Sequence, residues 1–147
     1  MSLRAIPLTV IAFLLYNVIV LFSGVGGSEA ADGAEAARAL LATVMFNIPM
    51  ISGVSWPFTW GDFILLVTLV ILFTEIIKAT YTSAASMVDH GLSMLVFIAV
   101  LIEFIVVPQA ATSVFFFIML ALLIDVVAGA IIGIRVARRD IGFGAAP

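Results

Sequence analysis

The 147-residue sequence lacks cysteine and contains a single histidine, His90. Without cysteine the chain has no disulfide, no thiolate catalysis and no thiolate-bound zinc. With one histidine it cannot supply bis-histidine haem ligation or a two-histidine zinc motif. Charged residues make up 10% of the chain, against roughly 25% in soluble proteins. The net charge of −3 offers no basic face for nucleic acid. We therefore expect no metal, no cofactor and no nucleic-acid partner.

Hydrophobic residues make up 65% of the sequence, and they gather in four long apolar segments. A run of about 20 apolar residues can cross the hydrocarbon core of a bilayer. The predicted spans are 6–22, 58–79, 91–107 and 112–134. The first segment also has features of a signal peptide, since Arg4 precedes it, but we expect an uncleaved span. The sequence thus predicts one all-α domain over 1–147, an integral membrane four-helix bundle whose surroundings are the lipid bilayer.

A longer segment, 28–53, separates the first two spans. Apolar residues from Ala36 to Phe46 recur at helical spacing, and such a helix is too short to cross a bilayer. We expect it to lie in the outer membrane interface and to end before Pro49. The alternative is a re-entrant hairpin, which requires that protein covers its backbone. Trp56 and Trp60 are interface anchors at the start of the second span, because tryptophan favours the headgroup level.

The basic residues predict the orientation of the chain. With four spans, all but one of them fall on one side of the membrane, and only Arg38 falls on the other. Basic loops stay in the cytoplasm, so we expect both termini, including a tail over 135–147, to be cytoplasmic. The residues on the cytoplasmic side are Arg4, Lys78, Arg135, Arg138 and Arg139.

The last span carries a stripe of small residues. On a helix, residues four apart lie on one face. Small residues there let another helix approach closely, and the approach would shield the acid among them from lipid. The partner helix could belong to this chain, to a second copy or to a different protein. The residues of this stripe are Ala121, Asp125, Gly129, Gly133 and Ala137.

Three acids fall inside predicted spans: Asp125, Glu75 and Glu103. At a rise of ~1.5 Å per residue, Asp125 lies ~18 Å below the outer end of its span and Glu75 lies ~20 Å below Asp62. These depths are similar, so the two acids could be neighbours. Glu103 lies nearer the outer surface. One interpretation is structural: each acid bonds a neighbouring helix, a hydroxyl group or, for Glu75, the possible ion-pair partner Lys78.

The other interpretation of the acids is functional. Titratable groups at stepped depths can carry protons or cations across a membrane. Asp89 and His90 would then form the cytoplasmic mouth of the path, with the imidazole accepting protons. Asp89 has a structural alternative too, because aspartate often caps the start of a helix.

The second half of the chain contains four segments with a family resemblance. They are Thr74-Glu75-Ile76-Ile77-Lys78, Val88-Asp89-His90, Val107-Pro108-Gln109-Ala110-Ala111-Thr112 and Ile124-Asp125-Val126-Val127-Ala128-Gly129. Over 61–140 the sequence resembles small uncharacterised four-span bacterial inner-membrane proteins. That resemblance implies a location in the bacterial inner membrane and no particular activity.

No nucleophile–base pair or metal cluster is evident in the sequence, so we expect no enzyme. The prediction is a non-enzymatic membrane protein, either an accessory or assembly subunit of a larger membrane complex or a self-associating bundle. Its partner would be another membrane protein or a second copy. The alternative is a small proton- or cation-coupled transporter or channel component that uses the intramembrane acids.

Overall fold

The computed structural model describes residues 7–23, 30–80 and 84–143, with the backbone alone described for 21, 30–31, 84–89 and 135–143. These residues are mostly helical, with five α-helices, a short 3₁₀-helix and one antiparallel pair of strands. The elements are α1 (Thr9–Phe22), α2 (Ala30–Leu41), β1 (Val44–Pro49), β2 (Ser55–Thr59), α3 (Trp60–Ala79), α4 (Ala84–Val106), η3 (Pro108–Ala110) and α5 (Ser113–Phe143).

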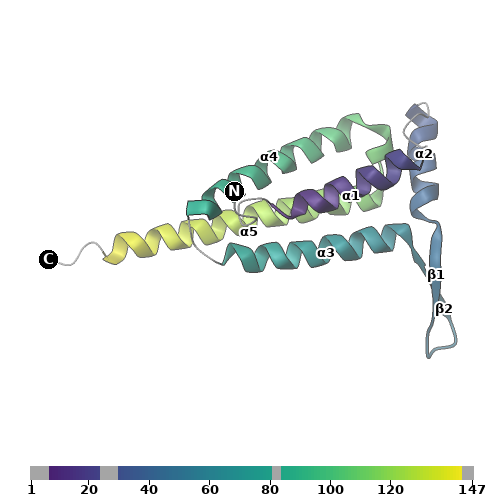
Figure 1. Ribbon diagram of the computed structural model, residues 1–147, viewed down its shortest axis with the longest axis horizontal. Helices are drawn as coiled ribbons and strands as arrows, with labels where there is room; N and C mark the ends of the chain where they lie inside the picture. Colours follow the sequence, from purple (N-terminus) through teal and green to yellow (C-terminus); the bar gives the residue numbers. More distant parts are fainter. Residues whose placement is uncertain (1–6, 24–29, 81–83, 144–147) are drawn as a thin grey trace.

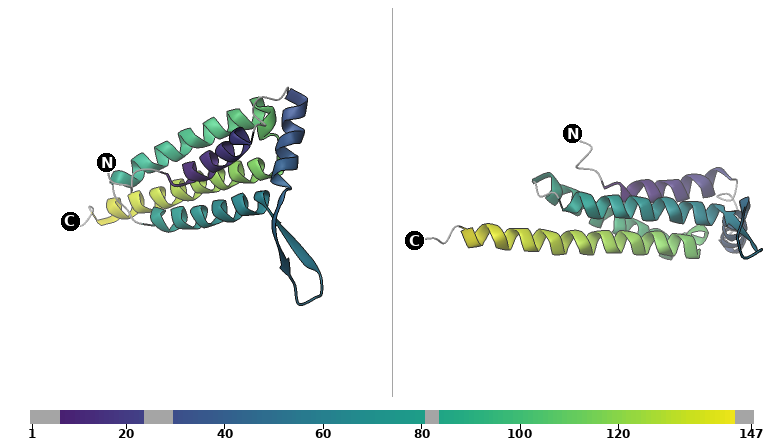
Figure 2. Two further views of the ribbon diagram at one scale, coloured as in Figure 1. Left: turned by 45° about the vertical axis from the view of Figure 1, so that its right-hand side comes forward. Right: turned by 90° about the horizontal axis from the view of Figure 1, so that it is seen from below.

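Four helices, α1, α3, α4 and α5, run alongside one another (Figure 1). The longest, α5, contacts the other three, and its C-terminal end extends beyond them (Figure 2). Helix α2 lies across the opposite ends of these helices, and the β1–β2 hairpin continues from it, roughly perpendicular to their axes (Figures 1 and 2). The bundle is therefore polarised: α1 begins and α5 ends toward one end, and the crosswise elements lie at the other (Figure 1).

Among the described residues, two helices are long and apolar enough to cross a membrane, Trp60–Ala79 and Ser113–Ile134. The apolar helical stretches Thr9–Val20 and His90–Val106 are shorter. The second span begins two residues later than predicted, because Thr59 and Asp62 form a capping box that starts α3 at Trp60. Each residue of that box bonds the backbone N–H of the other, which satisfies donors that a helix start leaves open.

The predicted all-α fold is wrong between α2 and α3. The expected interfacial helix over 36–46 ends at Leu41, and the chain then forms strand β1. Apolar residues such as Val44 and Phe46 suit a strand as well as a helix. Gly53, at φ 85°, occupies the left-handed position of a three-residue hairpin loop. Pairing with β2 then satisfies the backbone hydrogen-bonding groups of β1. A helix over the same residues could not pair with β2.

The predicted cytoplasmic tail, 135–147, is also partly helical. Helix α5 continues to Phe143, so the apolar run and the residues after it form one element. The side chains of Arg135, Arg138 and Arg139 lie outside the described part. At the other end of the bundle, Pro108 to Ala110 form η3, the tight turn between α4 and α5.

An aromatic cluster fills the space between α1, α4 and α5. The ring of Phe115 is fully buried and packs edge-on against Tyr16, with ring centroids 4.8 Å apart, and parallel to Phe104 at 6.3 Å. The Tyr16 hydroxyl donates to the Gln109 carbonyl at 2.7 Å and shares a hydrogen bond of 2.8 Å with the Thr112 hydroxyl. The hydrogen bonds of this one side chain therefore link α1 to the turn between α4 and α5.

We expect Tyr16→Phe to destabilise the protein by about 1 kcal/mol, the usual net contribution of an intramolecular hydrogen bond. Thermal unfolding of the purified protein in mild detergent measures the change. Thr74→Val is the matched control, because the Thr74 hydroxyl bonds only the Val70 carbonyl of its own helix. Equal losses in the two variants would contradict a joining role for Tyr16.

Candidate functional site

The N-terminal end of α1 meets the Glu75 carboxylate of α3. Helix α1 has no acidic residue in its first turn and no side-chain cap of its own. The backbone N–H of Leu8 donates instead to Glu75 Oε1. Carboxylates are favoured at helix N-termini, where N–H groups lack partners and the helix dipole is positive. Glu75 thus caps α1 from a different helix.

Glu75 also forms an ion pair with Lys78, one turn further along α3. The ammonium Nζ lies 3.0 Å from Oε2 and 3.1 Å from Oε1. The exposed fraction of Glu75 is only 2%, so the carboxylate is enclosed by protein. The lysine and the Leu8 N–H together compensate the negative charge of the carboxylate, which would otherwise be buried without a partner.

Asp125 of α5 approaches the same end of α1. Its carboxylate is buried, with 3% exposed, and the hydroxyl of Thr9 donates to Oδ2 at 3.4 Å. That distance is long for a hydrogen bond between oxygens. Glu75 and Asp125 also lie close enough to repel each other electrostatically. The structure therefore brings the two deep acids together at the first turn of α1.

Glu103 belongs to a different place. It lies near the C-terminal end of α4 and is half-buried, close to Asn17 of α1, whose side-chain amide donates to the Phe13 carbonyl of its own helix at 3.2 Å. Because Asn17 follows Thr9 by two helical turns, the two contacts are about 12 Å apart along α1. The three acids therefore do not form one cluster, although each contacts α1.

His90 of α4 fills the space beside Gly129 of α5. A Cβ atom built on Gly129 would overlap the imidazole ring, so only glycine leaves room for it. Within the described residues, the buried Nδ1 atom of His90 has no hydrogen-bond partner. Gly129 thus accommodates a side chain, whereas the sequence suggested the close approach of a second helix backbone.

The rest of the small-residue stripe divides along α5. Ala121 is buried, like Asp125 and Gly129. Gly133 is exposed, and a Cβ atom there would meet no atom within 4 Å. The side chain of Ala137 lies outside the described part. Ala121, Asp125 and Gly129 therefore pack inside this chain, whereas Gly133 is exposed.

Asp89, the predicted companion of His90 at the cytoplasmic mouth, lies outside the described side chains. The two tryptophans are both described. Trp56 is exposed on β2. Trp60 starts α3 and packs edge-on against Phe63, with ring centroids 6.0 Å apart. Both therefore lie at the end of the molecule where α2 crosses the helices.

Several important contacts were not foreseen from the sequence. Thr9, Tyr16 and Asn17 were the polar residues of an otherwise apolar span, which is a detectable signal. Arg38 of α2 donates to the Ala111 carbonyl from Nε at 3.2 Å and from Nη2 at 3.0 Å. This last contact ties α2 to the turn before α5 and had no sequence signal.

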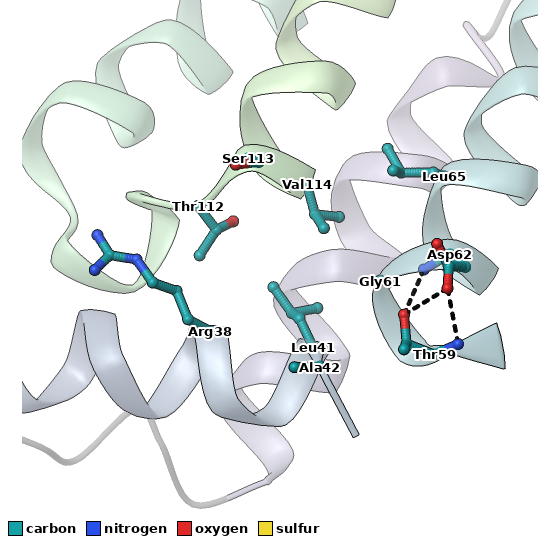
Figure 3. A pocket seen from close by; sticks show the side chains of 10 residues that line it. All are labelled: Arg38, Leu41, Ala42, Thr59, Gly61, Asp62, Leu65, Thr112, Ser113 and Val114. Atoms are coloured by element: carbon teal, nitrogen blue, oxygen red, sulfur yellow. Dashed lines mark hydrogen bonds between the residues drawn. The ribbon is translucent and has the colours of Figure 1, made fainter. Parts of the chain in front are cut away.

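An open pocket of ≈ 250 Å³ lies where α2, α3 and α5 meet (Figure 3). Its charged side chains already have partners, because Asp62 caps α3 through Thr59 and Arg38 bonds Ala111. The arrangement offers no nucleophile paired with a base. The lining residues are Arg38, Leu41, Ala42, Thr59, Gly61, Asp62, Leu65, Thr112, Ser113 and Val114. Elsewhere in the described ranges, no group of three or more histidines and acids is placed to hold a metal ion.

We expect Thr9→Val to destabilise the protein by about 1 kcal/mol, because it removes the hydroxyl that reaches Asp125 between helices. Thr68→Val is the matched control: Thr68 is equally buried, but its hydroxyl bonds the Ile64 carbonyl of its own helix. Chemical denaturation in detergent measures both variants. A loss at Thr68 as large as that at Thr9 would contradict the inter-helix role.

No family model matches the chain, and comparisons with curated proteins and with solved structures gave no significant match. The resemblance of 61–140 to four-span bacterial inner-membrane proteins therefore stays a prediction. Fold and function rest on the contacts described above.

Proposed function

We propose that this protein is a four-span bacterial inner-membrane protein with a non-enzymatic role in assembly. It would join a larger membrane complex as an accessory subunit or associate with a second copy of itself. The observation that carries the proposal is the use of the acids: Glu75 and Asp125 each accept a hydrogen bond from a group on α1. Polar side chains used in this way hold helices together.

The outer faces of the helices support a membrane location. Large apolar side chains are exposed on every one of the four long helices, and soluble monomers rarely expose such wide apolar patches. In a bilayer these faces would contact lipid. They include Ile11, Leu14 and Val18 of α1, Leu66, Leu69 and Phe73 of α3, Leu95, Ile98 and Ile102 of α4, and Phe117, Leu123 and Ile131 of α5.

The exposed face of α5 at Gly133 is the surface that supports a partner. A Cβ atom on Gly133 would meet no atom within 4 Å, and the C-terminal end of α5 extends past the other helices (Figure 2). A glycine on an uncovered helix face allows the backbone of a second helix to approach closely. The covered part of the stripe, from Ala121 to Gly129, is already occupied by this chain. The partner contact would therefore begin at Gly133.

We expect Gly133→Leu to weaken association while leaving the monomer folded, because a Cβ atom at this exposed position meets no other part of the described chain. Co-purification of partners from native membranes, with energy transfer between labelled copies in liposomes, measures the loss. Ala99→Leu is the matched control, since Ala99 is an exposed small residue on α4.

Gly129→Leu separates packing from assembly. The larger side chain would collide with His90, so it should lower the stability of the monomer itself. The proposed assembly surface at Gly133 would be contradicted if Gly133→Leu left association unchanged while Gly129→Leu alone lowered the stability of the monomer.

A second candidate, a small proton- or cation-coupled transporter or channel component, is favoured by one observation. Glu75 and Asp125 meet at the start of α1, and His90 packs on Gly129, one helical turn from Asp125. In the proposed orientation, these three titratable groups would follow one another through the cytoplasmic half of the protein.

Transport predicts pH-dependent flux through purified protein in liposomes. Asp125→Asn and Glu75→Gln should reduce that flux and keep the fold, because an amide keeps the acceptor oxygen but cannot exchange a proton. Gly133→Leu should leave flux unchanged. Wild-type protein without flux under proton and cation gradients would remove this candidate.

A further inference from the structure

The β1–β2 hairpin has one fully apolar face. Strand residues alternate between two faces, and directly paired residues share a face. The register pairs Phe46 with Phe58 and Ile48 with Trp56. The bond from the Met50 N–H to the Val54 carbonyl, 2.9 Å long, closes the next pair. The rings agree with this assignment: those of Phe46 and Phe58 stack at 4.9 Å, and that of Trp56 packs edge-on against Phe58 at 5.7 Å. One face therefore carries Phe46, Ile48, Met50, Val54, Trp56 and Phe58.

The opposite face is different in kind. It carries Asn47 and Pro49 on β1 and Ser55 and Pro57 on β2. The hairpin is therefore amphipathic. Most of the apolar face is uncovered, with Val54 66% and Phe46 51% exposed, and Ile51 projects from the loop at the tip.

The position of the hairpin indicates what covers this face. The hairpin extends sideways past α3, roughly perpendicular to the helix axes and level with the N-terminal end of α3 (Figures 1 and 2). If the helices cross a bilayer, a hairpin in this direction lies in the plane of the membrane surface. It then extends over the lipid beside α3 rather than into water.

The charge distribution favours lipid as well. No charged residue occurs from Thr43 to Gly61, whereas α2, at the same end of the molecule, exposes Asp32, Glu35 and Arg38. Trp56 lies on the apolar face, and Trp60 follows directly at the start of α3. Tryptophan is enriched at the headgroup level, and a basic or acidic protein partner would require charges that the hairpin does not offer.

We propose that the β1–β2 hairpin is a lipid anchor whose apolar face rests in the boundary between headgroups and acyl chains of the outer leaflet. Amphipathic elements of this kind bury their apolar face ~5–10 Å below the headgroups. The anchor rests on the proposed membrane arrangement, which it extends by assigning a lipid-binding surface outside the spans. It holds α2 and the adjoining pocket at the membrane surface.

The absence of cysteine permits a direct test with single-cysteine variants of the full chain. Val54→Cys probes the apolar face, and Ser55→Cys, the next residue, is the matched control on the polar face. Leu69→Cys, on the outer face of α3, probes the membrane arrangement separately. Each variant carries an environment-sensitive fluorophore in phosphatidylcholine–phosphatidylglycerol vesicles. Quenching is compared between aqueous iodide and a phospholipid with a nitroxide at the top of its acyl chain.

The anchor predicts strong lipid quenching of the Val54→Cys label and strong iodide quenching of the Ser55→Cys label. Met50→Cys, opposite Val54 on the same face, should repeat the Val54 result. Iodide access at Val54 equal to that at Ser55 would overturn the anchor, as would protection from both quenchers, which would indicate a protein contact. Lipid quenching at Leu69 in those cases would leave the membrane arrangement standing. Iodide access at Leu69 would overturn both proposals.

Discussion

The packing of the long helices depends on how the first turn of α1 is bonded. A helix start exposes N–H groups that need acceptors, and α1 contains none of its own at this end. Glu75 supplies an acceptor from α3 to the Leu8 N–H, and Asp125 receives the Thr9 hydroxyl from α5. Two acids that would be costly on their own in an apolar interior are thus stabilised by the helix that they help to position. The ion pair with Lys78 completes the compensation at Glu75.

The same helix connects the two ends of the molecule. Seven residues after Thr9, the Tyr16 hydroxyl bonds the turn that leads into α5. Two of the three polar side chains of α1, Thr9 and Tyr16, therefore bond another part of the bundle. This pattern explains why, in the assembly proposal, the intramembrane acids join helices through hydrogen bonds. It also explains why the transport candidate needs the histidine on α4 to extend the path.

Most of the helical structure and the proximity of Glu75 and Asp125 were predictable because both follow from local rules. Apolar runs predicted the helices, and the rise per residue predicted that the two acids could be neighbours, as they are at the start of α1. The hairpin was not predictable in the same way. Val44 to Phe46 satisfy a helical and an extended pattern equally, and the choice depends on pairing with Ser55 to Thr59, which is a non-local contact. The stripe on α5 shows a similar limit: spacing found Gly129, but only the fold shows that His90 of another helix occupies the space beside it.

The length of α5 has a mechanical consequence. Its 31 residues correspond to about 46 Å at the α-helical rise, whereas the hydrocarbon core of a bilayer is about 30 Å thick. In the proposed orientation, an upright α5 would continue as a rigid rod for several turns on the cytoplasmic side. Anything attached to its far end would be held at a fixed distance from the membrane and would turn with the helix. A rotation or tilt of the packed spans would therefore reach the cytoplasm as a displacement of that end.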